Sequence, residues 1–460
     1  MTSPGLTGRF SVPIQEGCTL KKLLMLGTSL GSLDIVRTAQ ALGCHVIVTD
    51  YLPPELSLAK RGADEQWMIS TGAVDELELR CRKEGVDAVF AGVSEFNLDR
   101  VLDLCERLGL PCYFDRNAWE YARNKARFKE LCRVTGVPVA GEFRLDEGDI
   151  IALHAGSPEA PDASLRFPVV VKPVDGCGNQ GVSFCHDRTE LLEAWQLVRE
   201  VSDNPRVLVE EYVSGVEYCN VYALADGEAS LLCVRTGFKQ PGYPTNLYIL
   251  GTTVAEHVEE YVRDINPAVT RMLKEAGCHD GLAWIQTIRD NEGRYSVLEM
   301  GHRLSADMVF DKMVTMTGFD AVRWMVECQL GVRHTADQLP QSQEHAFRDC
   351  ASAYLLFAER AGVVSQIVGV ETVANWAGPL TRQEESVSVE LLIHPGDAVK
   401  QHQLVGKVTF HSVDCDGLCE MVRFINRELR IVDDDGHNMF VRFTDLGRVS
   451  ATYERSLESW

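Results

Sequence analysis

The sequence predicts an α/β protein, and three features along the chain carry that prediction. Short apolar stretches alternate with helical periodicity over residues 21–115, which is the pattern of a parallel sheet with helices on both faces. A glycine-rich loop at residues 175–181 then joins two further strands, and residues 345–460 consist mainly of predicted strands and turns. A chain of 460 residues suggests about three domains, which agrees with this division.

The front region, residues 21–115, is expected to alternate strictly between strands and helices. Its predicted strands are KLLML (22–26), CHVIVTD (44–50), VDAVFAG (86–92) and LPCYF (110–114), and its predicted helices are LDIVRTAQALG, VDELELRCRKEG and NLDRVLDLCERLG, the last ending at Gly109. Because strand–helix–strand units place their strands in parallel, this order predicts a Rossmann-like domain.

The middle region follows a different pattern, with short strands around one helix and then a series of hairpins. We expect a helix through residues 117–136, a loop at 151–165, strands at 167–172, 182–185 and 206–213, and a helix at 189–201. Further along, we expect two strands within 217–240 around the Asp226-Gly227 turn, and a helical region at 255–277 that is interrupted near Pro267. A hairpin of 281–289 with 294–300 follows. In the C-terminal region we expect one helix, near 416–428, among the strands.

Composition excludes several classes of function. The net charge is −22 and no basic run is present, so the sequence predicts no nucleic-acid partner. No apolar stretch approaches the length of a membrane span. The 15 cysteines include no C-x-x-C pair and many lie in apolar runs, which predicts reduced thiols in a cytoplasmic protein. His411, Cys415 and Cys419 lie at four-residue spacing, but a zinc site is disfavoured because no fourth ligand is evident.

Two glycine motifs are candidate phosphate-binding sites. The segment at 176–181 matches G-x-G-x-x-G, but the strand VSFC follows it where a dinucleotide site needs a helix. A strand–glycine loop–strand hairpin can instead lie over phosphates, because glycine leaves backbone N–H groups accessible. The turn containing Gly27 and Gly31 does precede a helix, and Asp50 follows it about 20 residues later, so a dinucleotide site there stays open as an alternative.

Several motifs follow one another in an order that is more informative than any of them singly. These are LGLPCYF, then Asn124-Lys125 leading to TGVP, FPVVVKP, the glycine loop, VLVEEYV, GVEY and a hairpin ending in LEMGHR. In this order they resemble the ATP-grasp superfamily of carboxylate–amine ligases, such as L-amino acid ligases and carbamoyl-phosphate-synthase-like proteins. The resemblance implies a terminal arm (1–20), a Rossmann-like domain (21–115), an ATP-grasp domain (116–335) with a lid at about 166–213, and a strand-rich C-terminal domain (345–460).

The resemblance also assigns roles to individual residues, with ATP and Mg²⁺ as the implied cofactors. The implied ATP-binding residues are Lys125 and Lys172 at the phosphates, Gly176, Gly178 and Gly181 in the flap, Glu210, Tyr212 and Val213 on the strand that meets adenine, and Glu217 near the ribose. The implied catalytic residues are Arg303 and Lys239, and the implied metal ligands are Glu299 and Gln286.

Two positions depart from the E-x-N-x-R pattern that the family carries on its last strand. Gly301 stands where asparagine is usual, and Gln286 stands where the partner strand usually carries glutamate. A glutamine can still offer its carbonyl oxygen, and Mg²⁺ needs few carboxylates when phosphates and waters complete its shell. The lost charge leaves open a non-catalytic, ATP-binding regulatory relative. A biotin-carboxylase-like or dinucleotide-dependent enzyme is a further alternative.

The chemistry that the resemblance implies is phosphoryl transfer followed by acyl transfer. A substrate carboxylate attacks the γ-phosphate of ATP to give an acyl phosphate and ADP, and an amine then displaces phosphate. Such a site works by positioning and charge neutralisation, so it needs no side-chain nucleophile. The implied partners are a small carboxylate, such as an amino acid, an amine, and a second copy of the chain, because dimers are common in the family. Glu95, which follows the VDAVFAG strand, is a candidate amine contact.

Overall fold

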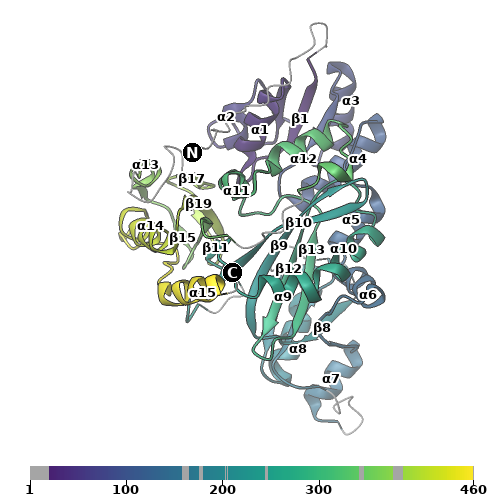
Figure 1. The fold of residues 1–460 in the computed structure, drawn as a ribbon, viewed down its shortest axis with the longest axis vertical. Coiled ribbons are helices and arrows are strands. Elements are labelled where there is room, and N and C mark those ends of the chain that lie inside the picture. Colours follow the sequence, from purple (N-terminus) through teal and green to yellow (C-terminus); the bar gives the residue numbers. More distant parts are fainter. Residues whose placement is uncertain are drawn as a thin grey trace, which may run out of the picture.

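The computed structural model describes residues 20–157, 165–175, 180–202, 204, 206–243, 247–340, 347–376 and 387–458. Its mixture of helices and sheets confirms the predicted α/β class. In Figure 1 the front region lies at the top and the lid, with α7 (Glu147–Ala155) and α8 (Arg188–Val201), lies at the bottom. The C-terminal helices α14 (Cys415–Glu428) and α15 (Leu446–Glu458) lie beside the large sheet, on its left.

The front region is a four-stranded parallel sheet in the order β3-β2-β1-β4. Its elements are β1 (Lys22–Leu26), α1 (Ser32–Ala41), β2 (His45–Thr49), α2 (Leu58–Gly62), β3 (Glu65–Trp67), α3 (Val74–Glu84), β4 (Ala88–Phe90) and α4 (Glu95–Leu108). The three predicted strands β1, β2 and β4 are almost completely buried, as parallel strands with covered faces should be. The edge strand β3, which is only three residues long, was not predicted.

The predicted lid segment at about 166–213 forms α8 and three strands of a small antiparallel sheet in the order β5-β8-β6-β7. Strand β5 and helix α7 precede that segment but belong to the same unit, which we call the lid. Its strands are β5 (Glu142–Phe143), β6 (Val169–Pro173), β7 (Ser183–Cys185) and β8 (Val207–Glu211). Leu153, Trp195 and Val198 of the two helices share one apolar core with Val169 and Val209 of the strands. The lid therefore has its own core.

An eight-stranded sheet forms the body of the molecule, in the order β13-β12-β9-β10-β11-β14-β19-β17. Its strands are β9 (Gly215–Ala225), β10 (Glu228–Phe238), β11 (Leu250–Thr252), β12 (Gly281–Asp290), β13 (Tyr295–Gly301), β14 (Cys350–Phe357), β17 (Val387–Leu391) and β19 (Leu404–Ser412). The last three strands come from the C-terminal region, so one continuous sheet joins that region to the centre of the chain.

Helices cover one face of the central strands. Residues of α5 (Arg116–Arg123), α6 (Lys125–Thr135), α9 (Val258–Asp264) and α10 (Asn266–Glu275) form a common core with β9 and β12. The remaining elements are α11 (Phe310–Thr317), α12 (Ala321–Gln329), η1 (Ala336–Gln338), β15 (Gly362–Val363), β16 (Gln366–Val368), α13 (Val370–Ala374), β18 (Ala398–Val399) and β20 (Arg430–Val432).

The strand predicted at 110–114 is wrong. This segment bonds to side chains and loops instead of to a sheet neighbour: the Pro111 carbonyl accepts a hydrogen bond from Gln329, and the Tyr113 hydroxyl donates one to the His302 carbonyl. Because Tyr113 and Phe114 are buried, their apolar pattern resembles that of a strand.

Two further predictions in the middle region need correction. The helix expected over 117–136 is broken at Asn124, whose side chain accepts hydrogen bonds from the first turn of α6 and so starts a second helix. The loop expected at 151–165 overlaps α7, which begins with a capping box between Asp146 and Asp149 and continues to Ala155.

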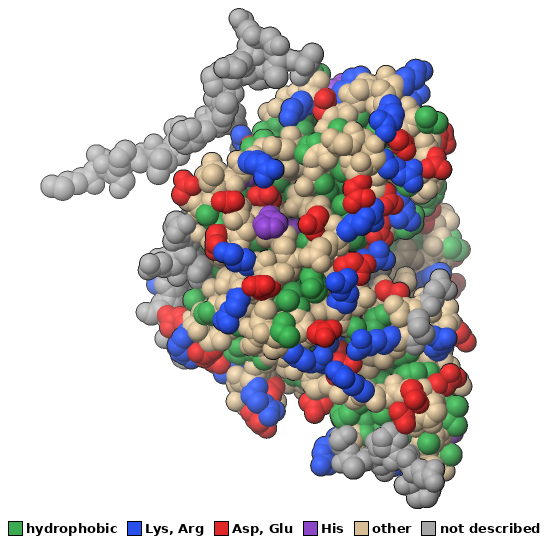
Figure 2. All heavy atoms as spheres, turned by 90° about the vertical axis from the view of Figure 1, so that its right-hand side faces the viewer, with side chains coloured by type: hydrophobic (Ala, Val, Ile, Leu, Met, Phe, Trp, Pro, Cys, Tyr) green, Lys and Arg blue, Asp and Glu red, His purple; other side chains and the backbone are tan. Residues whose placement is uncertain are grey.

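The surface in Figure 2 mixes charges of both signs. Lys and Arg side chains lie among Asp and Glu side chains on this face, and apolar side chains form small groups. The net charge of −22 is therefore not gathered into one acidic patch on this face. Within the described residues, no helix combines the length and the apolar character that crossing a membrane requires.

Candidate active site

A cleft of about 950 Å³ is bounded by the lid, the large sheet and the C-terminal region. Pockets of this size hold small-molecule ligands and cofactors. Predicted site residues that line it are Lys125, Glu217, Gln286, Glu299 and Arg303, which come from four different elements and the loop after β13. Gln180, Val182 and Phe184 of the lid hairpin form another wall.

The oxygen-bearing side chains of the cleft meet across the hairpin of β12 and β13. Gln286 lies directly opposite Glu299 in the strand register. Lys125 Nζ lies 3.7 Å from Glu299 Oε2. The Gln286 amide donates a hydrogen bond to one carboxylate oxygen of Glu217. Lys239 Nζ lies 2.9 Å from the other oxygen, which is a hydrogen-bond distance. Glu217 therefore links the predicted metal-site amide to Lys239.

Lys172 lies in a buried ion-pair group rather than on the cleft wall. Its Nζ is 3.0 Å from one oxygen of Glu210, and Lys129 Nζ of α6 is 2.8 Å from the other. Burial alone would raise the pKa of the Glu210 carboxyl, but Lys172 and Lys129 outweigh it, and the pKa lies below its ordinary value. Burial lowers the pKa of Lys129 to about 8, against the attraction of Glu210. This group joins the lid to α6.

Arg303 is held in place on two sides. Its guanidinium lies 3.0 Å from Glu95 at the start of α4 and donates to the Leu304 carbonyl. It also lies over the Trp284 ring, 4.9 Å from the centroid, which is a cation–π distance. Glu95, the predicted amine contact, is thus the counter-ion of Arg303 in this structure.

Trp284 explains the missing asparagine at position 301. The two residues face each other across β12 and β13. A Cβ atom built on Gly301 would lie 2.2–2.5 Å from the Trp284 indole, so no larger side chain fits while the indole is there. The indole therefore occupies the space in which the family's asparagine would stand.

Restoring that asparagine tests this overlap. We expect Gly301→Asn to destabilise the protein by about 1–3 kcal/mol, because its side chain overpacks the indole. The double variant Gly301→Asn, Trp284→Ala should recover most of the loss in urea unfolding. Gly447→Asn is the control, since that glycine has open space around its Cβ position and no left-handed φ. If Gly301→Asn were as stable as the control, the overlap would be disproved.

The predicted flap and adenine-binding residues are only partly described. Gly176 and Gly178 lie outside the described residues, whereas Gly181 has a left-handed φ of 70°. Tyr212 is exposed at the end of β8, and its ring meets the Phe184 ring edge-on at 5.5 Å. Val213 is half-buried beside it. The Glu210 backbone lies between β5 and β6, so its contacts within the described structure are to protein strands.

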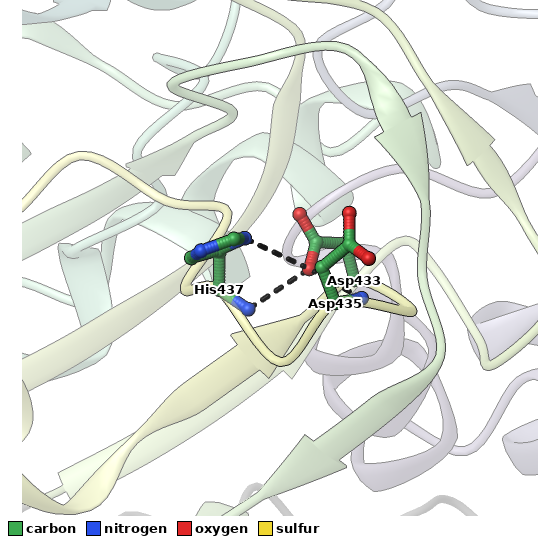
Figure 3. A group of neighbouring side chains, drawn as sticks. All are labelled: Asp433, Asp435 and His437. Atoms are coloured by element: carbon green, nitrogen blue, oxygen red, sulfur yellow. Dashed lines mark hydrogen bonds and ion pairs between the residues drawn. The ribbon is translucent and has the colours of Figure 1, made fainter.

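The donor set of the cleft fits a metal ion that phosphates help to hold. A metal site built from protein groups alone needs several ligand atoms close together. Among the described residues, one group of three His, Cys, Asp or Glu side chains has its ligand atoms within 4.8 Å of one another: Asp433, Asp435 and His437, outside the cleft (Figure 3). That exposed turn is explained by hydrogen bonds from the His437 and Asp435 amides to the Asp433 carboxylate. The cleft offers the Glu299 carboxylate and the Gln286 carbonyl, which suit Mg²⁺ completed by phosphate oxygens and waters.

The front glycine turn is occupied by the protein itself. The Gly31 amide donates a 2.7 Å hydrogen bond to the Glu390 carboxylate, and Met308 fills the space above Gly31. Asp50, the candidate ribose ligand, is buried and pairs with Lys60 at 2.9 Å. These contacts place protein groups where the pyrophosphate and ribose of a dinucleotide would lie.

Two of the three residues in the disfavoured zinc motif, Cys415 and Cys419, lie side by side on α14. Cys415 and Cys419 Sγ atoms lie 4.0 Å apart, whereas His411 pairs with Asp349 at 3.2 Å. These residues are not among the described clusters with three ligand atoms in reach. The structure therefore gives no support to a zinc site there.

Several cleft residues were not predicted from the sequence. Buried Arg235 lines the cleft, and it pairs with buried Asp307. The Tyr248 ring lies against the Gly237 and Gly251 positions, where a Cβ would come within about 3.0–3.3 Å of it. The turn 400–403 and Leu404 bring the C-terminal region to the same cleft. None of these residues lies within a motif named above, and no local signal marked them.

Comparison with known proteins agrees with this geometry. Residues 165–311 match the model of the ATP-grasp domain. Formate-dependent phosphoribosylglycinamide formyltransferase of Prochlorococcus marinus is 27% identical over 225 residues, which are 48% of this chain and 56% of that protein. Biotin carboxylase 1 of Bacillus subtilis is 22% identical, covering 69% of this chain and 72% of that protein. The chain spans about half the length of the first curated relatives it matches.

Solved structures show the same fold. The L-amino acid ligase from Bacillus licheniformis superposes with a TM-score of 0.72 at 20% identity, covering 90% of this chain and 99% of that one. A biotin carboxylase from Campylobacter jejuni superposes with a TM-score of 0.68 at 16% identity, covering 96% and 95%. The predicted resemblance is confirmed at the level of the domain and the fold: residues 165–311 form an ATP-grasp domain, and most of the chain shares the fold of these solved structures.

Proposed function

We propose that this protein is an ATP-dependent ligase that joins a small carboxylate, such as an amino acid, to an amine through an acyl phosphate. The observation that carries the proposal is the convergence of Glu299, Gln286, Lys125 and Arg303 in one cleft under the lid hairpin. The relatives named above act on formate, on L-amino acids or as carboxylases, and a solved 2-oxoglutarate carboxylase domain binds MgADP and bicarbonate. A small carboxylate or its equivalent is common to these names.

In the proposed reaction, each charged or polar residue at the cleft has a separate role. Lys125 neutralises the phosphates as a compact point charge. Lys172, which pairs with Glu210 behind the cleft wall, instead helps to hold the lid strands on α6. Glu299 and the Gln286 carbonyl would hold Mg²⁺, which supplies charge neutralisation at the transferred phosphoryl group. Arg303, fixed by Glu95 and Trp284, neutralises the carboxylate and then the acyl phosphate. Lys239 acts through Glu217, which it contacts at 2.9 Å.

The test is ADP release over a panel of carboxylates and amines. The proposal expects a carboxylate–amine pair to stimulate ADP formation and to yield an amide by mass spectrometry. ATP binding without stimulation by any pair would instead indicate the regulatory relative. Stimulation by bicarbonate and biotin, without amide formation, would indicate a carboxylase.

We also propose that the protein is cytoplasmic and works as a homodimer. The thirteen cysteines that the structure describes are all free thiols, which suits a reducing compartment. A biotin carboxylase domain with the same fold is described as a dimer. Sedimentation equilibrium would measure the mass in solution.

A further inference from the structure

The turn at residues 400–403 brings a strained histidine to the cleft. His402 has a φ of 64°, in the left-handed region that only a few per cent of residues other than glycine adopt, histidine among the more frequent of them. The turn is fixed on both sides, because the His402 amide donates to the Ala358 carbonyl and the Ala358 amide donates to the Gln403 carbonyl. Residues held in such conformations concentrate at functional sites.

The imidazole has a buried nitrogen that no described group satisfies. His402 lines the cleft, its ring meets Tyr243 edge-on at 5.0 Å, and its Nε2 is buried without a hydrogen-bond partner. Buried polar atoms of folded proteins are nearly always paired. The imidazole therefore lines the cleft without a hydrogen bond that commits its Nε2 to another group of the described protein.

The other ionisable groups on the described cleft wall are already committed. Its two carboxylates are engaged by cations, Glu217 by Lys239 and Glu299 by Lys125. Burial raises the pKa of Cys219, of Tyr218 and of Tyr248, so all three stay protonated at neutral pH. The remaining ionisable lining residues, Lys125, Arg235, Arg303 and Lys400, are cations.

We infer that His402 binds the amine substrate and accepts the proton that it must lose before it attacks; this inference rests on the proposed function. An amine at neutral pH is an ammonium ion and has no lone pair. Transfer of one N–H proton to the imidazole frees that pair, which forms the C–N bond at the acyl carbonyl. The C–O bond to phosphate breaks, phosphate leaves with the bonding electrons, and the second N–H proton goes to phosphate. The imidazolium returns its proton to water.

This assignment requires the amine to lie between the turn 400–403 and Arg303, which line the same cleft, so that it can reach the acyl phosphate. It also assigns a catalytic role to the C-terminal region, because the turn 400–403 connects β18 to β19, and β19 is a strand of the large sheet. Positioned general bases contribute about 10²–10⁴-fold to a rate, so the loss of His402 should be large for the amine step alone.

Hydroxylamine separates the two half-reactions, because it is uncharged at neutral pH and attacks an acyl phosphate without help from a base. We expect His402→Asn, which suits a left-handed φ, to form hydroxamate from ATP and the carboxylate at nearly the wild-type rate. Its rate of amide formation with the amine should fall about 10²–10⁴-fold. His402→Gly should behave alike. His437→Asn, the same change at an exposed histidine of this region, should alter neither rate.

Three outcomes would overturn one claim or the other. Amide formation at the wild-type rate in His402→Asn disproves the base. If both His402 variants melt at the wild-type temperature but lose hydroxamate and amide formation equally, His402 acts in the first half-reaction. That result also disproves its role as the base for the amine. Wild-type protein that forms no hydroxamate with any carboxylate disproves the proposed function itself.

Discussion

Glu299→Gln is expected to lower ATP turnover by about 10²–10³-fold while ATP binding is partly retained. Glu299 is the one carboxylate on β13 that faces the cleft near Lys125, and the family's other metal ligands are represented here by Gln286 and Gly301. Removing its charge takes away most of the protein's own attraction for Mg²⁺, because only the glutamine amide remains. Lost charge stabilisation at a transferred group commonly costs two to three powers of ten.

The matched control for this prediction is Glu292→Gln. It makes the same change in the same hairpin, at an exposed position of the turn where Glu292 pairs with Arg294. Steady-state ADP release and calorimetric binding of ATP measure the two effects. Equal turnover in the two variants would place the metal elsewhere.

Glu210→Gln is expected to destabilise the protein by about 3–5 kcal/mol. The side chain is almost completely buried between Lys129 and Lys172, and breaking one member of a buried ion pair leaves the other charges uncompensated. Because this group joins the lid to α6, the lid should also become more sensitive to proteolysis. Urea unfolding measures the loss. The control is Glu211→Gln, one residue further on and exposed. Equal stability of the two variants would contradict the assignment.

The same ion-pair group predicts how stability depends on pH. The folded pKa of Glu210 lies below its ordinary value, so its contribution is complete at neutral pH and is lost as the pH falls through the folded pKa. Lys129 acts in the opposite range. Its folded pKa of about 8 lies below the ordinary 10.5, so the unfolded chain binds more protons between these values and stability rises with pH there. Lys129→Met should remove that rise.

Much of the fold could be predicted because its signals are local. The alternation of strands and helices over 21–115 and the turn at 290–293 depend on residues that are close in sequence, and the structure forms β1, β2, β4, β12 and β13 accordingly. The ordered motifs also place Lys125, Glu217, Gln286, Glu299 and Arg303 in one cleft. The apolar segment 110–114 failed as a strand because burial alone does not provide a neighbouring strand to pair with.

The details of the site depend on register and on contacts between distant residues. Arg289 pairs with Tyr295 next to the turn, and counting back from there would pair Gln286 with Leu298. A bulge between Gln286 and Thr287 shifts the register, which sets Gln286 opposite Glu299 and Trp284 opposite Gly301. Nothing in the local sequence predicts that bulge. Likewise, the contact of Glu390 with Gly31 joins residues that are 359 positions apart.

The central claim is that the carboxylate is activated by phosphoryl transfer in the cleft of Lys125, Glu299 and Arg303. The most direct measurement uses the most active carboxylate, labelled with ¹⁸O, together with ATP and the amine. We predict that mass spectrometry finds one ¹⁸O atom in each released phosphate, because the carboxylate oxygen that attacks the γ-phosphate leaves with it. Phosphate without ¹⁸O, with amide formed, would contradict an acyl phosphate and with it the proposed mechanism.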